Sequence, residues 1–293
     1  MRINPKTKVL SAMTPWVVIM AAATLLAADG PATGPVQQPL KPLSPVHAGM
    51  TGDELFAKLL ECNRARDTRL RQYSVVRTYR VSNDKGKLYA QEVVRVDYQA
   101  PDHKGFRTIS EEGSGMVRDM VLKRLIESES ETSSGRAHHD SAIKPANYEF
   151  NLVGEQEVGP YHCLVAEAIP KRRDKYLFEG KVWIDAQDYA IVRIEGQPAK
   201  SLSFWVTRAD FVRQYQRIGE FWLPAEDNTE VHIRLYGKKI LTIDHRDYAV
   251  NCSGGAATES RADNESNVTQ LSGRGAGESC VSSASKEGKA DSE

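Results

Sequence analysis

The sequence lacks the features that would place it in a common functional class. Its 39 Lys and Arg residues balance 39 Asp and Glu residues, so it has no cationic excess of the kind that general nucleic-acid binding needs. Four cysteines in 293 residues are too few for a disulfide scaffold. The sequence also contains no H-E-x-x-H, G-x-S-x-G, P-loop or C-x-x-C motif. We therefore expect no metal, no cofactor and no enzymatic activity.

Long apolar runs are also scarce, and the longest uncharged one lies near the N-terminus. It spans Trp16–Ala28 and follows a start that holds Arg2, Lys6 and Lys8. A helix of this length reaches only about 20 Å, short of the roughly 30 Å hydrocarbon core of a bilayer. The pattern is typical of a secretory signal peptide over residues 1–28. It predicts export to the periplasm or cell envelope, with an uncleaved signal anchor as the alternative.

Two further segments have compositions that do not favour packed structure. Five prolines lie between residues 31 and 45, and proline removes backbone donors. Residues 253–293 are rich in Ser, Gly, Ala and charge, with few large aliphatic side chains to offset the entropy of ordering. We expect a disordered linker over 29–50, one domain over 51–252 and a disordered polar tail over 253–293.

The pattern of apolar residues in the domain predicts two helices and many strands. Thr51 is a good N-cap for a helix that should run to about Leu70. Apolar residues then alternate with polar ones through most of the domain, apart from a helical pattern over 116–126 and an expected bulge near Arg246. Because no βαβ alternation occurs, nine to eleven strands should form an antiparallel sheet. The predicted fold class is α+β, a strongly curved open half-barrel with helices on its concave side.

One hairpin gives the domain a family resemblance. The stretch Tyr176–Glu195 reads as a strand, a Trp-x-Asp turn and a second strand with an arginine. It resembles the corresponding hairpin of the bacterial outer-membrane lipoprotein-sorting proteins, which have the LolA-like fold. Asn147–Phe150, Phe204-Trp205 and Phe221–Pro224 are also similar to segments of that group. The resemblance implies a cavity for lipid acyl chains and a role as a periplasmic lipid or lipoprotein carrier.

Candidate site residues follow from the apolar strand faces and from the second helix. We expect the groove to be lined by Val94, Val96, Trp183, Ile184, Phe204, Val231, Ile233 and Leu235. The apolar face of 116–126 is a candidate lid, with Met116, Met120, Val121 and Leu125. The alternative for Trp183 is an indole buried in the core, and the alternative for the lid is ordinary core packing.

Polar candidates are few. His138-His139-Asp140 should be a solvated loop rather than a metal site, and His245, between Asp244 and Arg246, should belong to a surface ion-pair cluster. The basic run 171–175 should be a solvated turn, with contact to anionic headgroups as the alternative. The cysteine pairing stays open, since four cysteines allow three pairings; Cys280 is the one expected to be unpaired.

Three functions remain as alternatives. The first is a carrier whose partners are lipid or lipoprotein acyl chains. The second is an envelope-stress sensor or scaffold on the same fold, which would bind envelope proteins and could touch the membrane surface. The third is a hydrolase with a dispersed site. Nucleic acid is not an expected partner of any of them.

Overall fold

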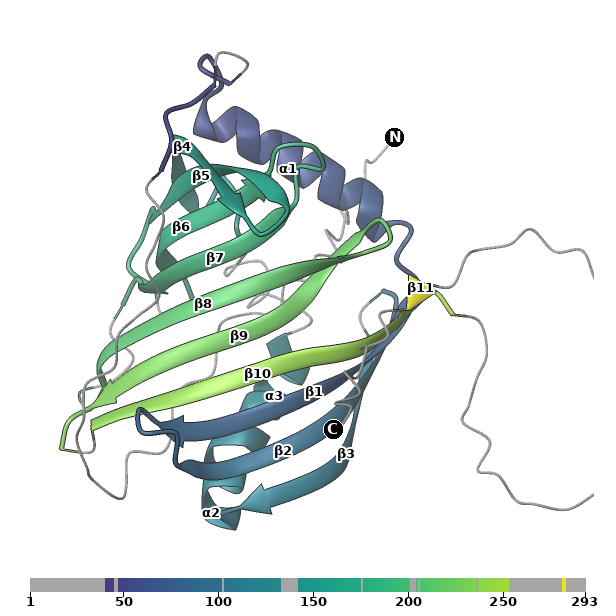
Figure 1. The fold of residues 1–293 in the computed structure, drawn as a ribbon, viewed down its shortest axis with the longest axis vertical. Helices are drawn as coiled ribbons and strands as arrows, with labels where there is room; N and C mark the ends of the chain where they lie inside the picture. Colours follow the sequence, from purple (N-terminus) through teal and green to yellow (C-terminus); the bar gives the residue numbers. More distant parts are fainter. Residues whose placement is uncertain are drawn as a thin grey trace, which may run out of the picture.

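A single antiparallel sheet organises the chain (Figure 1). The structure, a computed structural model, describes residues 40–44, 47–101, 103–132, 142–174, 176–200, 204, 206–235, 237–252 and 281–282. Its main strands are β1 Gln72–Asn83, β2 Leu88–Gln99, β3 His103–Gly113, β4 Tyr148–Val158, β5 Tyr161–Pro170, β6 Phe178–Asp185, β7 Ile191–Pro198, β8 Val206–Ile218, β9 Phe221–Ile233 and β10 Gly237–Val250. Their order is β3-β2-β1-β10-β9-β8-β7-β6-β5-β4, so β3 and β4 form two unjoined edges. The predicted α+β class with an open antiparallel sheet is confirmed.

The first helix, α1, spans Gly52–Asp67. Thr51 is its N-cap: the Thr51 hydroxyl accepts the Glu54 N–H, and the Glu54 carboxylate accepts the Thr51 N–H, which completes a capping box. Gly52 lies so close to β4 that an added Cβ would be 1.9 Å from the Phe150 carbonyl oxygen. A glycine is therefore required where the helix begins.

The second helical segment follows β3 and contains an irregular turn. It consists of α2 Gly115–Val117, a π-helical turn η1 Arg118–Leu122 and α3 Lys123–Thr132. Leu122, which has no exposed surface, fixes this segment on the sheet, and η1 contacts β2. The first helix therefore lies beside β4, and α2 with η1 lies beside β2 at the other flank of the sheet. In Figure 1, α3 runs behind β10 and β1.

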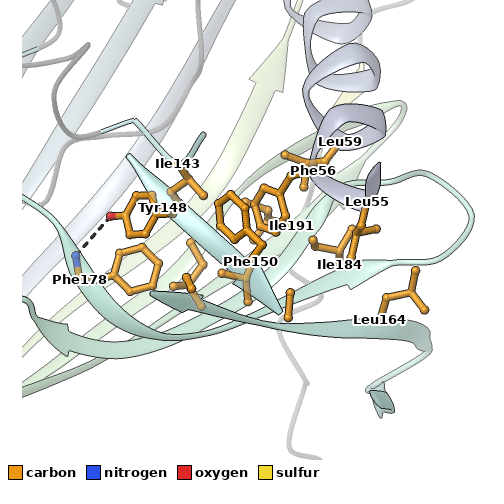
Figure 2. Packing of buried hydrophobic residues seen from close by; sticks show 14 of the residues in the cluster. Leu55, Phe56, Leu59, Ile143, Tyr148, Phe150, Leu164, Phe178, Ile184 and Ile191 are labelled. Carbon is orange, nitrogen blue, oxygen red and sulfur yellow. Dashed lines mark hydrogen bonds between the residues drawn. The ribbon is translucent and has the colours of Figure 1, made fainter. Parts of the chain in front are cut away.

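Buried apolar side chains form one cluster beneath each helical segment. The α1 cluster joins Leu55, Phe56 and Leu59 to strands β4–β8, and Figure 2 shows the Phe56 ring stacked on Phe150. The α3 cluster joins Leu122 to β1, β2, β10 and the turn between β8 and β9. Burial of each leucine-sized side chain contributes roughly 1.5–3 kcal/mol, so both helical segments are held mainly by packing.

Both clusters lie on the same face of the sheet, which we call the inner face. Thr229 on β9 is directly opposite Phe211 of the α1 cluster on one side and Leu241 of the α3 cluster on the other. Directly paired residues in antiparallel strands project to the same face. A third, smaller cluster of Cys163, Val165, Trp183 and Val192 lies on the opposite, outer face.

The described residues before α1, 40–44 and 47–50, contact the sheet, whereas the sequence predicted a disordered linker there. Lys41 forms a β-bridge with Glu155 on the edge strand β4, and Leu40 packs against the outer cluster. Leu43 and Met50 pack against the α1 cluster on the other face. The segment therefore wraps around the edge of β4 and covers part of an otherwise unpaired strand edge. The predicted signal peptide, 1–28, and linker residues 29–39 lie outside the described residues.

The C-terminal segment also meets the sheet at one point. Strand β11, Val281–Ser282, pairs with Ala249 and Val250 of β10, although the composition predicted a disordered tail. Val281 packs against the α3 cluster, which gives this short strand an apolar anchor. Cys252, just past β10, is disulfide-bonded, whereas Cys62 and Cys163 are free thiols. Cys280, which was expected to be unpaired, and the rest of the tail lie outside the described residues.

Candidate functional site

A row of charged side chains crosses the centre of the inner face. Arg213 on β8 is directly opposite Asp227 on β9, and His245 on β10 is directly opposite Arg77 on β1. His245 lies two residues beyond Ile243, the residue paired with Asp227, so it projects to the same face. All four side chains are buried. We call Arg213, Asp227, His245 and Arg77 the inner polar row.

The Asp227 carboxylate is the centre of this row. One oxygen contacts Nε of Arg213, and the other lies 3.1 Å from Nε2 of His245. Burial would raise the pKa of Asp227, but the Arg213 cation and the His245 hydrogen bond outweigh it and hold the pKa below its usual range. Asp227 is therefore an anion shared between two neighbouring strands.

His245 is held neutral by its surroundings. Burial lowers its pKa most, the Arg77 and Arg213 cations lower it further, and Asp227 only partly opposes them. A neutral ring donates from one nitrogen only, so the Nε2 proton points to Asp227 and Nδ1 is an acceptor. The Tyr248 hydroxyl lies 3.5 Å from Nδ1 and donates to the Pro224 carbonyl at 2.9 Å. The prediction that His245 belongs to a surface ion-pair cluster is wrong, because His245 is buried. Its neighbour Asp244 instead pairs with Arg80 on the outer face.

The row continues onto β1 and β2. Nη1 of Arg77 donates to the Tyr79 hydroxyl oxygen at 3.3 Å. Only 2% of the surface of Arg77 is exposed. Tyr79 is directly opposite Glu92 on β2, a buried acid whose carboxylate accepts the Thr108 hydroxyl of β3 at 2.9 Å. Polar groups therefore reach from β8 to β3 along one face.

The row lies between the two apolar clusters of the inner face. Phe211 and Tyr215 flank it on the side of the α1 cluster, and Tyr79, Ile243 and Tyr248 flank it on the side of the α3 cluster. Buried hydrogen-bonding groups thus lie between two apolar surfaces on one face of the sheet. Such an arrangement suits recognition of an apolar chain with a polar group along it.

The predicted groove residues do not form one set. Val94, Val96 and Val231 are buried on the inner face, Ile184 is buried in the α1 cluster, and Ile233 is half-buried. Trp183 lies in the outer cluster, as neighbouring strand residues must alternate, and its indole N–H donates to Gln156. Phe204 and Leu235 are 72% and 84% exposed at one end of the sheet. These three side chains are therefore not on the inner face with the others.

The predicted lid residues are divided as well. Val121 and Leu125 pack against the α3 cluster, whereas Met116 is 61% exposed and Met120 is half-buried. Their neighbour Leu122, which the sequence analysis did not single out, is the buried anchor because the π-helical turn shifts the helical face.

The sequence analysis also missed Arg77, Arg213 and Asp227. In the sequence Arg77 alternates in phase with Tyr73, Val75 and Tyr79, and a lone arginine in such an apolar pattern is the signal that could have identified it. The partners of Arg213 could not be read in the same way, since they depend on how β8, β9 and β10 are paired. His138-His139-Asp140 lies outside the described residues.

A second polar cluster fastens the segment before α1 to β4. The buried Glu155 carboxylate accepts the Ser44 N–H at 3.0 Å and the Ser44 hydroxyl at 2.9 Å, and it lies 2.8 Å from Nδ1 of His47. Burial alone would raise the pKa of Glu155, but these hydrogen bonds and the nearby His162 lower it to about 2. His162 also contacts Glu157, which raises the pKa of its imidazole. No group of three or more metal-ligating side chains occurs within the described part of the chain.

Comparison with known proteins gives similarity to solved structures only. No family model and no curated protein matches the sequence. A DUF1329 family protein from Desulfovibrio piger is 12% identical over 71% of this chain and 96% of its own, with a TM-score of 0.36. An outer-membrane lipoprotein-sorting protein domain from Vibrio parahaemolyticus is 13% identical over 67% of this chain and 93% of its own, with a TM-score of 0.34. MucB of Pseudomonas aeruginosa, solved with MucA, is 12% identical over 66% of this chain and 93% of its own, with a TM-score of 0.24.

A lipoprotein-sorting domain, of the family that the Tyr176–Glu195 hairpin resembles, is among these structures. Such low identities and TM-scores carry no information about the function of this chain. No helix in the described ranges combines the length and apolar character needed to cross a bilayer.

Proposed function

We propose that the protein is an exported carrier that binds the acyl chains of lipids or lipoproteins on the inner face of its sheet. The observation that supports this best is the inner polar row, which separates two apolar clusters on one face of an open sheet. The described helices make their main strand contacts at the flanks, α1 with β4 and both α2 and η1 with β2. An acyl chain needs apolar surface without directional contacts, while its ester or amide group needs the kind of donors that arginine supplies.

Ligand binding is tested with a fluorescent fatty acid and one matched pair of variants. Ile243 lies on the inner face beside Asp227 and packs against the α3 cluster, whereas Thr242 projects to the outer face of the same strand. Ile243→Asp should weaken binding of the probe at least about tenfold, because it places a charge on the apolar surface. Thr242→Asp should leave binding within about twofold, since surface changes are usually small.

Circular dichroism and urea unfolding establish that both variants stay folded. Wild-type protein that binds no fatty acid, or equal loss of binding in both variants, would contradict the proposal. If the wild-type protein binds the fatty acid, mass spectrometry of the lipids that co-purify with it would identify its cargo.

Export is a separate part of the proposal and rests on Trp16–Ala28. Cell fractionation and sequencing of the mature N-terminus test it. A protein that begins near residue 29 in the periplasm supports cleavage, and an intact N-terminus in the membrane fraction supports an uncleaved anchor. Cytoplasmic protein with an intact N-terminus contradicts export.

A further inference from the structure

Four strand connections lie next to one another at one end of the sheet. They are the β1–β2 turn (84–87), the β5–β6 turn (171–177), the β7–β8 connection (199–205) and the β9–β10 turn (234–236). In an antiparallel meander every second connection returns to the same end. The pairs Phe178 with Pro198, Val206 with Ile233 and Asn83 with Lys239 bring these connections side by side. The β1–β2 and β9–β10 turns are both visible at the left of Figure 1.

This end of the sheet is strongly cationic, and we call it the basic end. Among the described residues of the four connections, the exposed basic residues are Lys85, Lys87, Lys171, Arg172, Arg173, Lys200 and Arg234. The acids in the same connections are Asp84 and Asp174. The described turns between strands at the opposite end hold Asp188 and Glu220 and neither Lys nor Arg. These four connections therefore carry a cationic excess that the described turns between strands at the opposite end lack, although the whole chain has no net charge.

Two large apolar side chains project from the basic end. Leu235 is 84% exposed at the tip of the β9–β10 turn, and Phe204 is 72% exposed beside the start of β8. The Arg234 guanidinium lies 4.6 Å from the centre of the Phe204 ring, so a cation covers part of one aromatic face. Leu235 has φ of +67°, a conformation that costs a leucine energy and that Asn or Gly would adopt more readily. A leucine therefore occupies a turn position whose backbone conformation favours Asn or Gly.

We propose that the basic end docks on an anionic lipid bilayer, with Phe204 and Leu235 entering the headgroup region. Clustered Lys and Arg side chains attract anionic headgroups, and flanking apolar side chains then partition below them. Two apolar side chains separated by charges suit a fluid bilayer. They are too small a patch for the apolar core of a stable protein interface, which an acidic protein partner would need. This surface is distinct from the inner face, so the inference does not depend on the proposed carrier function.

Co-sedimentation with lipid vesicles tests the proposal. The purified protein should sediment with vesicles of equal parts phosphatidylglycerol and phosphatidylcholine, and much less with phosphatidylcholine alone. The double variant Phe204→Ala/Leu235→Asn should bind the anionic vesicles at least about tenfold more weakly, because two apolar side chains no longer leave water. Asn suits the backbone at 235, so folding should be preserved.

Three further variants separate the contributions. The triple variant Lys85→Gln/Arg173→Gln/Lys200→Gln should lose most of the preference for anionic vesicles and show a smaller dependence on salt. Ile109→Asn removes an aliphatic side chain that is 57% exposed on β3, outside the basic end, and should not change vesicle binding. Ile243→Asp, on the inner face, should also sediment like the wild type.

Several outcomes would overturn the proposal. One is wild-type protein that stays in solution with anionic vesicles, and another is a double variant that sediments as well as the wild type. If soluble polyglutamate binds the basic end with the affinity of the vesicles, and the double variant keeps that binding, the surface recognises an acidic protein instead.

Discussion

His245 donates from Nε2 to Oδ2 of Asp227 across 3.1 Å, between neighbouring strands at the centre of the inner face. The other oxygen of Asp227 meets Arg213 on the next strand. One carboxylate thus ties β8, β9 and β10 together between the two apolar clusters of the inner face. Buried charges are costly unless paired, so this row favours one register of the three strands.

Asp227→Leu should be strongly destabilising. It leaves the Arg213 cation buried without its carboxylate, and breaking such a pair typically costs about 3–5 kcal/mol. The control is Asp210→Leu, which removes the acid of the exposed Arg208–Asp210 pair on the neighbouring strand β8 and should cost about 0–1 kcal/mol. Urea unfolding measures both. The double variant Arg213→Met/Asp227→Leu should recover much of the loss, and equal costs for Asp227 and Asp210 would contradict a buried pair.

His245 should make the protein less stable in mild acid. Its folded pKa lies below the ordinary value of 6.5, since burial, Arg77 and Arg213 together outweigh Asp227. Below pH 6.5 the unfolded chain therefore binds a proton that the folded chain does not, and the free energy of unfolding falls as the pH falls. His245→Gln should flatten this part of the stability curve, measured by urea unfolding at a series of pH values. An unchanged slope in the variant would mean that other groups cause it.

Local patterns predicted the elements of the fold well. The cap at Thr51 and the spacing of Leu55, Phe56 and Leu59 depend on residues within one or two turns, and α1 begins at Gly52 as expected, although it ends at Asp67 rather than near Leu70. Alternation of apolar residues is likewise local, so the strands and their antiparallel arrangement were predictable. The bulge expected near Arg246 is confirmed by the register shift between Arg246 and Ala249 opposite β1.

The site depends on contacts between distant residues, which no local pattern specifies. Asp227 meets His245 only because β9 and β10 pair in one register, and Glu155 meets His47 across 108 positions of sequence. Leu235 continues the alternation of β9 in the sequence, but the chain has already turned there and its φ is positive. The alternation therefore predicted an inward side chain where the structure has an exposed one.

Asp67→Asn should stabilise the protein above neutral pH. Burial raises the pKa of Asp67 to about 7, Arg66 opposes this only in part, and Oδ2 has no hydrogen-bond partner among the described residues. Between pH 3.8 and about 7 the unfolded carboxyl is ionised while the folded one keeps its proton, so stability falls with rising pH and the full penalty is reached above 7. Asn has the same shape without the charge. A gain of about 1–2 kcal/mol at pH 8, and a smaller one at pH 4, is expected from thermal or urea unfolding.

Glu155→Gln should loosen the segment that precedes α1. The folded pKa of about 2 means that Glu155 contributes stability above pH 4.5 and loses it as the pH falls toward 2. Gln keeps the size but forfeits the charged acceptor for Ser44 and His47, a loss of about 1–2 kcal/mol. Hydrogen exchange at the Lys41 N–H, which donates to the Glu155 carbonyl at 2.9 Å, should become faster in the variant. Glu157→Gln is the matched control, because Glu157 is a more exposed acid on the same strand and contacts only His162 in this cluster. The Glu157→Gln variant should leave the exchange rate of the Lys41 N–H unchanged.

Two facing glycines let β6 and β7 approach beneath the α1 cluster. Gly180 pairs with Gly196, and an added Cβ on Gly180 would lie 1.9 Å from the Glu195 carbonyl oxygen. An added Cβ on Gly196 would lie 2.9 Å from the Phe178 ring and 3.2 Å from the Phe211 ring. The absence of side chains here lets Phe178 and Phe211 meet edge to face, with centroids 5.6 Å apart.

Gly180→Ala should therefore destabilise the protein by about 3 kcal/mol or more, since the clash is with backbone and no rotamer relieves it. Gly105→Ala is the control, because this strand glycine has only the Asp97 carbonyl oxygen nearby, at 3.9 Å. It should be neutral or stabilise by about 0.4–1 kcal/mol, as alanine reduces the entropy of the unfolded chain. Urea unfolding of the two variants measures the difference. Similar free energies of unfolding for both would mean that β6 and β7 do not approach as closely as the Gly180–Gly196 pair requires.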